Sequence, residues 1–224
     1  MISHKHKCIF IHIPKCAGTS IEKALGHFDG HEGRGGQDHR SVRMIEQPFP
    51  QFACLRSFEN IKDVLRRIKY ARRNDRNPNN VITASYQQYI DYFKFTVVRD
   101  PWDRAYSWYK NATRDELHRK HLGISEDIEF EEFLKRFIGS GFLRPQLYWL
   151  KNFKGQIDMN YIARFENLEE DYNRIIDQLG VDFVKLPHEL NSGEVNYRSR
   201  FNKVTKEIID RFYQEEIQFL NYKY

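Results

Sequence analysis

The feature that most restricts the fold of this chain is an apolar run that leads through a tight loop into a helix start. Residues 9–20 read Ile-Phe-Ile-His-Ile-Pro-Lys-Cys-Ala-Gly-Thr-Ser. The apolar residues predict a buried strand, while Pro14 and Gly18 predict a turn. The hydroxyl residues Thr19 and Ser20 then stand where a helix should begin. A strand followed directly by a helix is typical of α/β folds with parallel strands.

A second unit of this kind covers residues 92–109, which read Tyr-Phe-Lys-Phe-Thr-Val-Val-Arg-Asp-Pro-Trp-Asp-Arg-Ala-Tyr-Ser-Trp-Tyr. Its first half predicts a buried strand, and Asp100 with Pro101 predicts the N-cap and first turn of a helix. Arg99 therefore stands at the carboxyl end of the strand, the edge at which open α/β sheets bind ligands. A guanidinium there suits a phosphate. The alternative is that Arg99 only caps the helix or pairs with a neighbouring acid.

The remaining segments extend the alternation of strands and helices. We expect a strand at 161–165, and helices at 19–25, within 125–138, at 168–179 and at 205–220. Asn167 and Glu170 predict a capping box for the helix at 168–179. The fold class is thus α/β, a three-layer P-loop-like fold with a central, largely parallel sheet flanked by helices. A length of 224 residues, with 40% hydrophobic residues, is enough for one domain over residues 1–224.

The loop at 14–20 has the chemistry of an anion cradle. Backbone N–H groups and the start of the next helix can face a phosphate or sulfonate, and Lys15 adds a mobile positive charge. In the Walker pattern of nucleotide-binding proteins, the lysine follows the second glycine. Here Lys15 precedes Gly18, and no glycine opens the loop. An ordinary P-loop kinase or NTPase therefore fits poorly.

The loop resembles the 5′-phosphosulfate loop of sulfotransferases that use 3′-phosphoadenosine 5′-phosphosulfate (PAPS). The wider pattern resembles the bacterial type 2 sulfotransferases, which are related to the carbohydrate sulfotransferases. Several segments in the same order carry this resemblance over most of the chain: Asp38-His39-Arg40-Ser41, the block from Arg99 to Tyr109, Gln146, residues 161–168 and Leu186-Pro187-His188.

The resemblance implies a role for each of these sites. The 5′-phosphosulfate would be held by the loop residues Pro14, Lys15, Cys16, Ala17, Gly18, Thr19 and Ser20. Lys15 would also be catalytic, because it neutralises the leaving phosphate. Arg99 with Ser107 would hold the 3′-phosphate, and Arg198, or Arg200 in its place, would be a further phosphate contact.

The resemblance also implies a catalytic base at His39, whose place in the Asp38-His39-Arg40-Ser41 segment matches the histidine of the family. A neutral imidazole can accept a hydroxyl proton near neutral pH. Asp38 could orient it. The alternative for His39 is a place in the acceptor pocket or a packing role. For His12, inside the first strand, we favour a core histidine over a functional one.

Composition restricts cofactors and location. His27, Asp29 and His31 have no diagnostic metal-ligand spacing, and no metal is expected. Three cysteines argue against a disulfide framework, and Cys16 is interpreted as a small loop filler. The amino terminus is polar, so we expect neither a signal peptide nor a transmembrane segment, and a cytoplasmic location.

A basic helical insertion is predicted around residues 54–80. Residues 56–76 carry an excess of five positive charges, equal to the net charge of the whole chain. Ile61, Val64, Leu65 and Ile68 share one face of the predicted helix. Such a helix could hold an anionic acceptor such as an acidic glycan, or contact a membrane surface. A plain solvated face is favoured over either.

These observations predict an enzyme that moves a sulfonate from PAPS to a hydroxyl, most plausibly of a carbohydrate, and releases adenosine 3′,5′-bisphosphate. In-line transfer of this kind depends on positioning and electrostatics. No nucleic-acid partner is expected. One alternative is a P-loop kinase-like phosphotransferase. The other is a non-catalytic nucleotide- or polyanion-binding protein that uses the basic helix.

Overall fold

A computed structural model of the chain describes residues 1–31, 33–47, 52–182, 186 and 196–224. The chain forms two compact units. The first comprises residues 1–98 and 147–190, and the second comprises residues 99–146 and 191–224. The assignment of the whole chain to one domain stays a prediction.

The first unit is built on a four-stranded sheet in the order β1-β2-β3-β4. Its strands are β1 (Ile2–Ser3), β2 (Cys8–Ile11), β3 (Phe93–Val98) and β4 (Tyr161–Arg164). β2 pairs with β3 and β3 with β4 in parallel, whereas β1 pairs with β2 antiparallel. Phe10 lies opposite Phe95 in this register, and their rings stack 5.0 Å apart between centroids. The largely parallel sheet expected from the sequence is confirmed.

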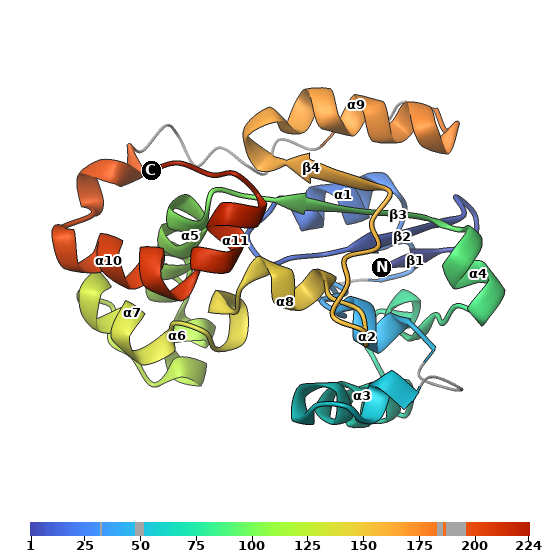
Figure 1. Cartoon of the computed structure of the whole chain (residues 1–224), viewed down its shortest axis with the longest axis horizontal. Helices are drawn as coiled ribbons and strands as arrows, with labels where there is room; N and C mark the ends of the chain where they lie inside the picture. The colour runs from blue at the N-terminus through green and yellow to red at the C-terminus, as the bar shows by residue number, and fades with distance from the viewer. Residues whose placement is uncertain (32, 48–51, 183–185, 187–195) are drawn as a thin grey trace. The chain divides into compact units, whose positions relative to one another are not determined.

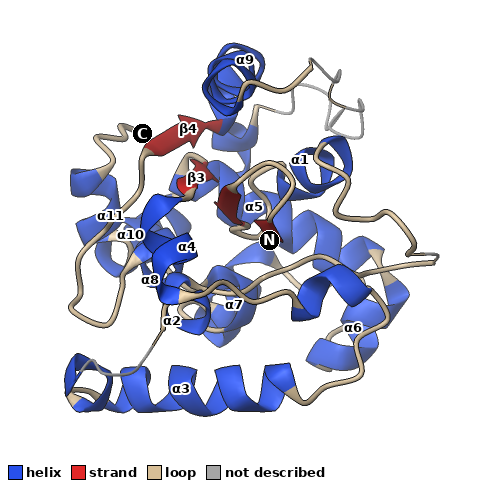
Figure 2. Ribbon diagram, turned by 90° about the vertical axis from the view of Figure 1, so that its right-hand side faces the viewer, coloured by secondary structure: helices blue, strands red, loops and turns tan. Residues whose placement is uncertain are grey.

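Helices cover both faces of this sheet (Figures 1 and 2). On one side lie α1 (Gly18–Ala24) and α9 (Leu168–Leu179), and on the other lie α2 (Val42–Ile45), α3 (Phe58–Ala71) and α8 (Gln146–Leu150). A short helix, α4 (Tyr86–Asp91), precedes β3 and begins at a capping box formed by Ser85 and Gln88. The unit is therefore the α/β three-layer fold that the strand–helix alternation predicts.

The second unit is helical in its described part. It contains α5 (Pro101–Arg114), α6 (Glu116–Leu122), α7 (Phe130–Phe137), α10 (Lys203–Phe212) and α11 (Gln214–Phe219). Asp100 caps α5 by accepting hydrogen bonds from the amides of Trp102 and Asp103, as the sequence predicts. The core of this unit consists of Trp102, Ala105, Trp108, Ala112, Ile128, Phe130, Phe133, Leu134, Leu143, Ile209 and Tyr213.

Two predictions about the helices are wrong, the single closing helix and the capping box at Asn167. The closing helix is two helices separated at Tyr213, whose buried hydroxyl donates to the carbonyl of Leu143. Asn167 makes no side-chain cap hydrogen bond, because it ends a 3₁₀ turn (Phe165–Asn167) that leads directly into α9. Local sequence patterns do not show where such contacts and turns end a helix.

Candidate functional site

The loop at residues 12–17 joins β2 to α1 and contains two residues in the left-handed backbone conformation. Lys15 has a φ of 70° and Ala17 a φ of 62°, values that are uncommon for residues with a β-carbon. Such strained residues cluster at ligand sites, and turns of this type can point amide N–H groups at one anion. Lys15 and Thr19 are half-buried, whereas Pro14, Ala17 and Ser20 are buried.

Cys16 is also buried, and its Sγ lies 3.7 Å from the carbonyl oxygen of Pro14. This placement agrees with the filler interpretation, because a buried thiol packs as a small apolar group.

Gly18 begins α1 against the ring of His12. A β-carbon at residue 18 would lie 2.0 Å from Cδ2 of His12, so only glycine fits there. His12 is 2% exposed, and its Nδ1 lies 3.0 Å from Oε2 of Glu22 on α1. Burial opposes ionisation of Glu22, but His12 and the amino-terminal ammonium outweigh it, so the pKa of Glu22 falls. His12 is thus a core residue that fixes the start of α1.

His39 lies beside the same histidine. The two rings are 4.2 Å apart between centroids, and Nδ1 of His39 lies 3.2 Å from the backbone oxygen of His12. Because a carbonyl oxygen can only accept, Nδ1 carries the proton in the neutral ring and Nε2 carries the lone pair. Burial, with a contribution from His12, lowers the pKa of His39 to about 3. His39 is therefore neutral near pH 7, with the tautomer that a base acting through Nε2 requires.

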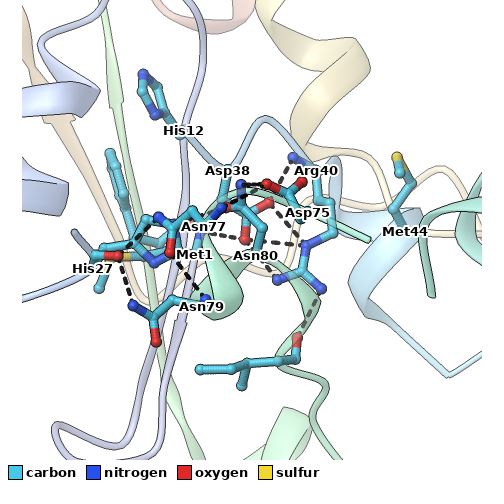
Figure 3. A network of polar contacts seen from close by, with 12 residues as sticks. Met1, His12, His27, Asp38, Arg40, Met44, Asp75, Asn77, Asn79 and Asn80 are labelled. Atoms are coloured by element: carbon cyan, nitrogen blue, oxygen red, sulfur yellow. Dashed lines mark hydrogen bonds and ion pairs between the residues drawn. The ribbon is translucent and has the colours of Figure 1, made fainter. Parts of the chain in front are cut away.

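Asp38 does not orient His39. Both of its carboxylate oxygens accept hydrogen bonds from the guanidinium of Arg40, at 2.6–3.1 Å (Figure 3). Burial opposes ionisation of Asp38, but Arg40 outweighs it and holds the pKa of this carboxyl well below its usual range. The orienting group for His39 is instead the carbonyl of His12, which a side-chain motif cannot reveal.

A glycine-rich segment before His39, described over residues 26–31 and 33–37, is held by asparagines from residues 77–80 (Figure 3). Nδ2 of Asn77 donates to the carbonyls of His27 and Gly36, each at 2.9 Å. The ring of His27 contacts Oδ1 of Asn80 at 2.9 Å through Nε2. Over the described part of the chain, no group of three or more histidine, cysteine and acidic residues is arranged to hold a metal ion.

The second unit brings Arg99 and Ser107 together. Arg99 is buried at the start of α5, and its Nη1 lies 3.4 Å from Oγ of Ser107. Its Nε donates to Oδ2 of Asp103 at 2.7 Å, an ion pair one helical turn along α5. The side-chain amide of Gln146 both accepts from the backbone amide of Arg99 and donates to its carbonyl, at 2.8 Å each. Asp103 and Gln146 are thus the residues that position Arg99.

Arg104 does not share a surface with Ser107, although their spacing suggests it. The Arg104 side chain is fully buried and donates to the carbonyls of Phe142 and Arg144 at 2.9 and 2.8 Å. It is a structural residue, because the guanidinium satisfies backbone groups of a neighbouring turn.

Arg198 is exposed and stacks on two aromatic rings. Its guanidinium lies 5.6 Å from the ring centroids of both Tyr197 and Tyr224. The hydroxyl of Tyr197 donates to Asp100, the N-cap of α5, at 2.8 Å. Arg198 is therefore connected to the start of α5, the helix that follows Arg99. Arg200 is exposed as well. Leu186 is described, but Pro187 and His188 lie outside the described residues.

Comparisons with known proteins identify the family of the chain. The profile of the sulfotransferase family matches residues 1–223. Carbohydrate sulfotransferase 10 of Xenopus laevis is 21% identical over 262 residues, which cover 99% of this chain. The chain spans 66% of the length of that relative, just under two thirds. An uncharacterized protein of Archaeoglobus fulgidus is 31% identical over 114 residues, which cover 48% of this chain and 83% of that protein. No solved structure matches the chain.

Among the described residues, no helix has the length and apolar character needed to span a membrane.

Proposed function

Because the chain belongs to the sulfotransferase family, we propose that it transfers a sulfonate group from PAPS to a hydroxyl group of a carbohydrate. The observation that carries this proposal is the loop after β2, with its left-handed Lys15 and Ala17 and with Gly18 packed directly against the ring of His12. The carbohydrate acceptor is supported by the similarity to carbohydrate sulfotransferase 10.

The residues of the loop fit the 5′-phosphosulfate of such a donor. When bound, PAPS supplies a sulfonate that is activated by its anhydride bond to phosphate. Loop amides from Cys16 to Thr19 would donate to its oxygens, and Lys15 would neutralise the phosphate as the bond breaks. A sulfonate carries less charge than a phosphate, so Lys15 and the amides suffice in this proposal and no metal ion is included.

Arg99 and Ser107 fit the 3′-phosphate. They are adjacent, and a guanidinium with a hydroxyl offers several donors to phosphate oxygens. Asp103 holds the guanidinium through Nε, which leaves its orientation fixed before a ligand arrives. Arg198 is proposed as a second cation for the nucleotide.

His39 is proposed as the base. Its Nε2 would accept the proton of the attacking hydroxyl while Nδ1 keeps its hydrogen bond to the carbonyl of His12. The imidazolium formed would be stabilised by the ionised Glu22, which lies beside His12. The hydroxyl oxygen would then attack the sulfonate in line, without a covalent protein intermediate.

The test is sulfonate transfer from labelled PAPS to a panel of glycans. Lys15→Ala should lower transfer by at least about 100-fold, because it removes the charge that stabilises the leaving phosphate. Lys5→Ala is the matched control, since Lys5 is an exposed lysine outside the loop.

Two results would contradict the proposal. The first is that no acceptor leads to release of adenosine 3′,5′-bisphosphate. The second is full transfer by the Lys15→Ala variant, which would favour a polyanion-binding role for the basic helix.

A further inference from the structure

Helix α3 packs on the rest of the first unit through its polar side. Asp63 is fully buried there and accepts hydrogen bonds from Nε of Arg43 at 2.8 Å and Nη1 of Arg66 at 2.7 Å. Nδ2 of Asn60 donates to the carbonyls of Ala53 and Phe153 at 2.8 and 2.9 Å. Polar residues therefore anchor the helix, which inverts the usual orientation of an amphipathic helix on a protein core.

The opposite side of α3 is apolar and exposed. Four large apolar side chains at helical spacing form it, here called the α3 apolar face: Phe58 (72% exposed), Ile61 (38%), Leu65 (61%) and Ile68 (44%). Two further exposed apolar residues, Phe52 and Leu55, lie in the 3₁₀ turn before the helix (Phe52–Leu55). Contiguous apolar surfaces of this kind mark sites that contact a partner or a membrane.

Two exposed cations, Lys62 and Lys69, lie on α3 beside the apolar face, and four more lie near the ends of the helix: Arg56, Arg72, Arg73, which pairs with Asp75, and Arg76. Lys62 and Lys69 each follow a residue of the face, Ile61 and Ile68, and Nζ of Lys62 lies 4.4 Å from the ring centroid of Phe58. Glu59 is the one exposed acid on α3. The face thus combines an apolar centre with a positively charged border.

We propose that α3 docks on the surface of a lipid bilayer that carries anionic headgroups. Its apolar side chains would enter the boundary between headgroups and acyl chains, while the flexible lysine and arginine side chains reach the phosphates. Each basic residue near an anionic bilayer contributes about 1 kcal/mol, equivalent to about fivefold in affinity.

Charge complementarity selects this partner over two others. In a pair of identical chains, the two borders would place like charges against one another, which disfavours self-association. An acidic glycan could pair with the cations, but it offers no apolar surface to cover Leu65 and Ile68. An anionic bilayer satisfies both parts of the face.

The experiment is sedimentation of the full chain with vesicles of phosphatidylcholine alone or mixed with phosphatidylglycerol. We expect binding to the mixed vesicles that weakens as salt rises. Phe58→Ser with Leu65→Ser should reduce binding at least about tenfold. Phe219→Ser, at a 55% exposed phenylalanine on α11, is the matched control and should bind as the parent chain does.

Lys62→Gln with Lys69→Gln tests the border and should lower binding to mixed vesicles by more than about tenfold, with little effect on folding, because both side chains are exposed. This variant also decides the question if the apolar variant fails to fold. Absence of binding to mixed vesicles at low salt would overturn the proposal. So would equal binding to neutral vesicles, or concentration-dependent dimers that disappear in the Phe58→Ser, Leu65→Ser variant.

Discussion

Ala17 and Gly18 are neighbours in the loop, but their backbone and packing requirements are opposite. Ala17 has a left-handed φ that glycine adopts more easily, whereas Gly18 lies against His12 with no room for a β-carbon. The backbone therefore favours glycine at position 17, where the chain has alanine, and the packing requires glycine at position 18.

This contrast gives a paired prediction. Ala17→Gly should raise the free energy of unfolding by up to about 1 kcal/mol, because it relieves the left-handed strain. Gly18→Ala should lower it by about 1–3 kcal/mol, because the new methyl group overlaps the ring of His12. Urea denaturation of both variants measures the two changes. Shifts of the same sign in both would contradict this account of the loop.

The proposed role of His39 as the base can also be tested with a single substitution. His39→Gln should reduce sulfonate transfer by about 100- to 10,000-fold, since it removes the base. It should leave the thermal shift with adenosine 3′,5′-bisphosphate unchanged. His121→Gln, at an exposed histidine on α6, is the control. A loss of transfer under tenfold would instead favour the packing role for His39.

The low pKa of His39, about 3, sets the expected pH dependence. The folded chain keeps this ring neutral, so protonation of His39 should cause no loss of transfer between about pH 8 and 6. The unfolded chain takes up a proton on this ring below its ordinary pKa of about 6.5. The stability that the neutral ring contributes is therefore complete above that pH and is lost as the pH falls toward 3. His39→Gln should reduce this acid sensitivity in denaturation measured across pH.

At the scale of elements, Arg99 is positioned by the first turn of α5 and by the side chain of Gln146. Asp100 caps the helix, and Asp103 and Gln146 fix the side chain and backbone of Arg99. The sequence places Arg99 after a strand. The partners that make it rigid are one turn along the helix and in a distant segment.

A prediction for α5 concerns the 3′-phosphate. Arg99→Ala should weaken binding of adenosine 3′,5′-bisphosphate by about 10- to 100-fold, the effect of losing a hydrogen-bonded charge. Binding of AMP, which lacks the 3′-phosphate, should change much less. Arg114→Ala is the control at an exposed arginine of the same helix. Titration calorimetry with both nucleotides measures the difference. An equal loss of affinity for AMP would show that Arg99 does not bind the 3′-phosphate.

Helix α3 shows that the periodicity of a helix does not determine which of its sides is buried. The spacing of Ile61, Leu65 and Ile68 defines an apolar face, but it cannot say whether that face is covered. Asp63 and Asn60 turn the polar side inward, because buried polar groups are stable when they are fully hydrogen-bonded.

At the scale of the whole molecule, the choice of nucleotide separates an enzyme of the sulfotransferase family from a P-loop kinase. Adenosine 3′,5′-bisphosphate should raise the melting temperature of the chain, because a ligand at 100 times its Kd stabilises the folded state by about 2.7 kcal/mol. Mg-ATP at the same concentration should raise it less. A larger, magnesium-dependent shift with ATP would instead support the kinase alternative.

The sequence by itself determined the order of strands and helices, the parallel sheet, and the places of Lys15 and Arg99 after strands β2 and β3. These features follow from local patterns: apolar runs, turn residues and helix caps act between near neighbours in the chain. The tertiary structure alone decided that the carbonyl of His12 orients His39, that Asn77 holds the glycine-rich segment, and that α3 exposes its apolar side. Each of these depends on which residues, far apart in the sequence, come into contact and exclude water. The spacing of neighbouring residues does not encode burial and pairing of that kind.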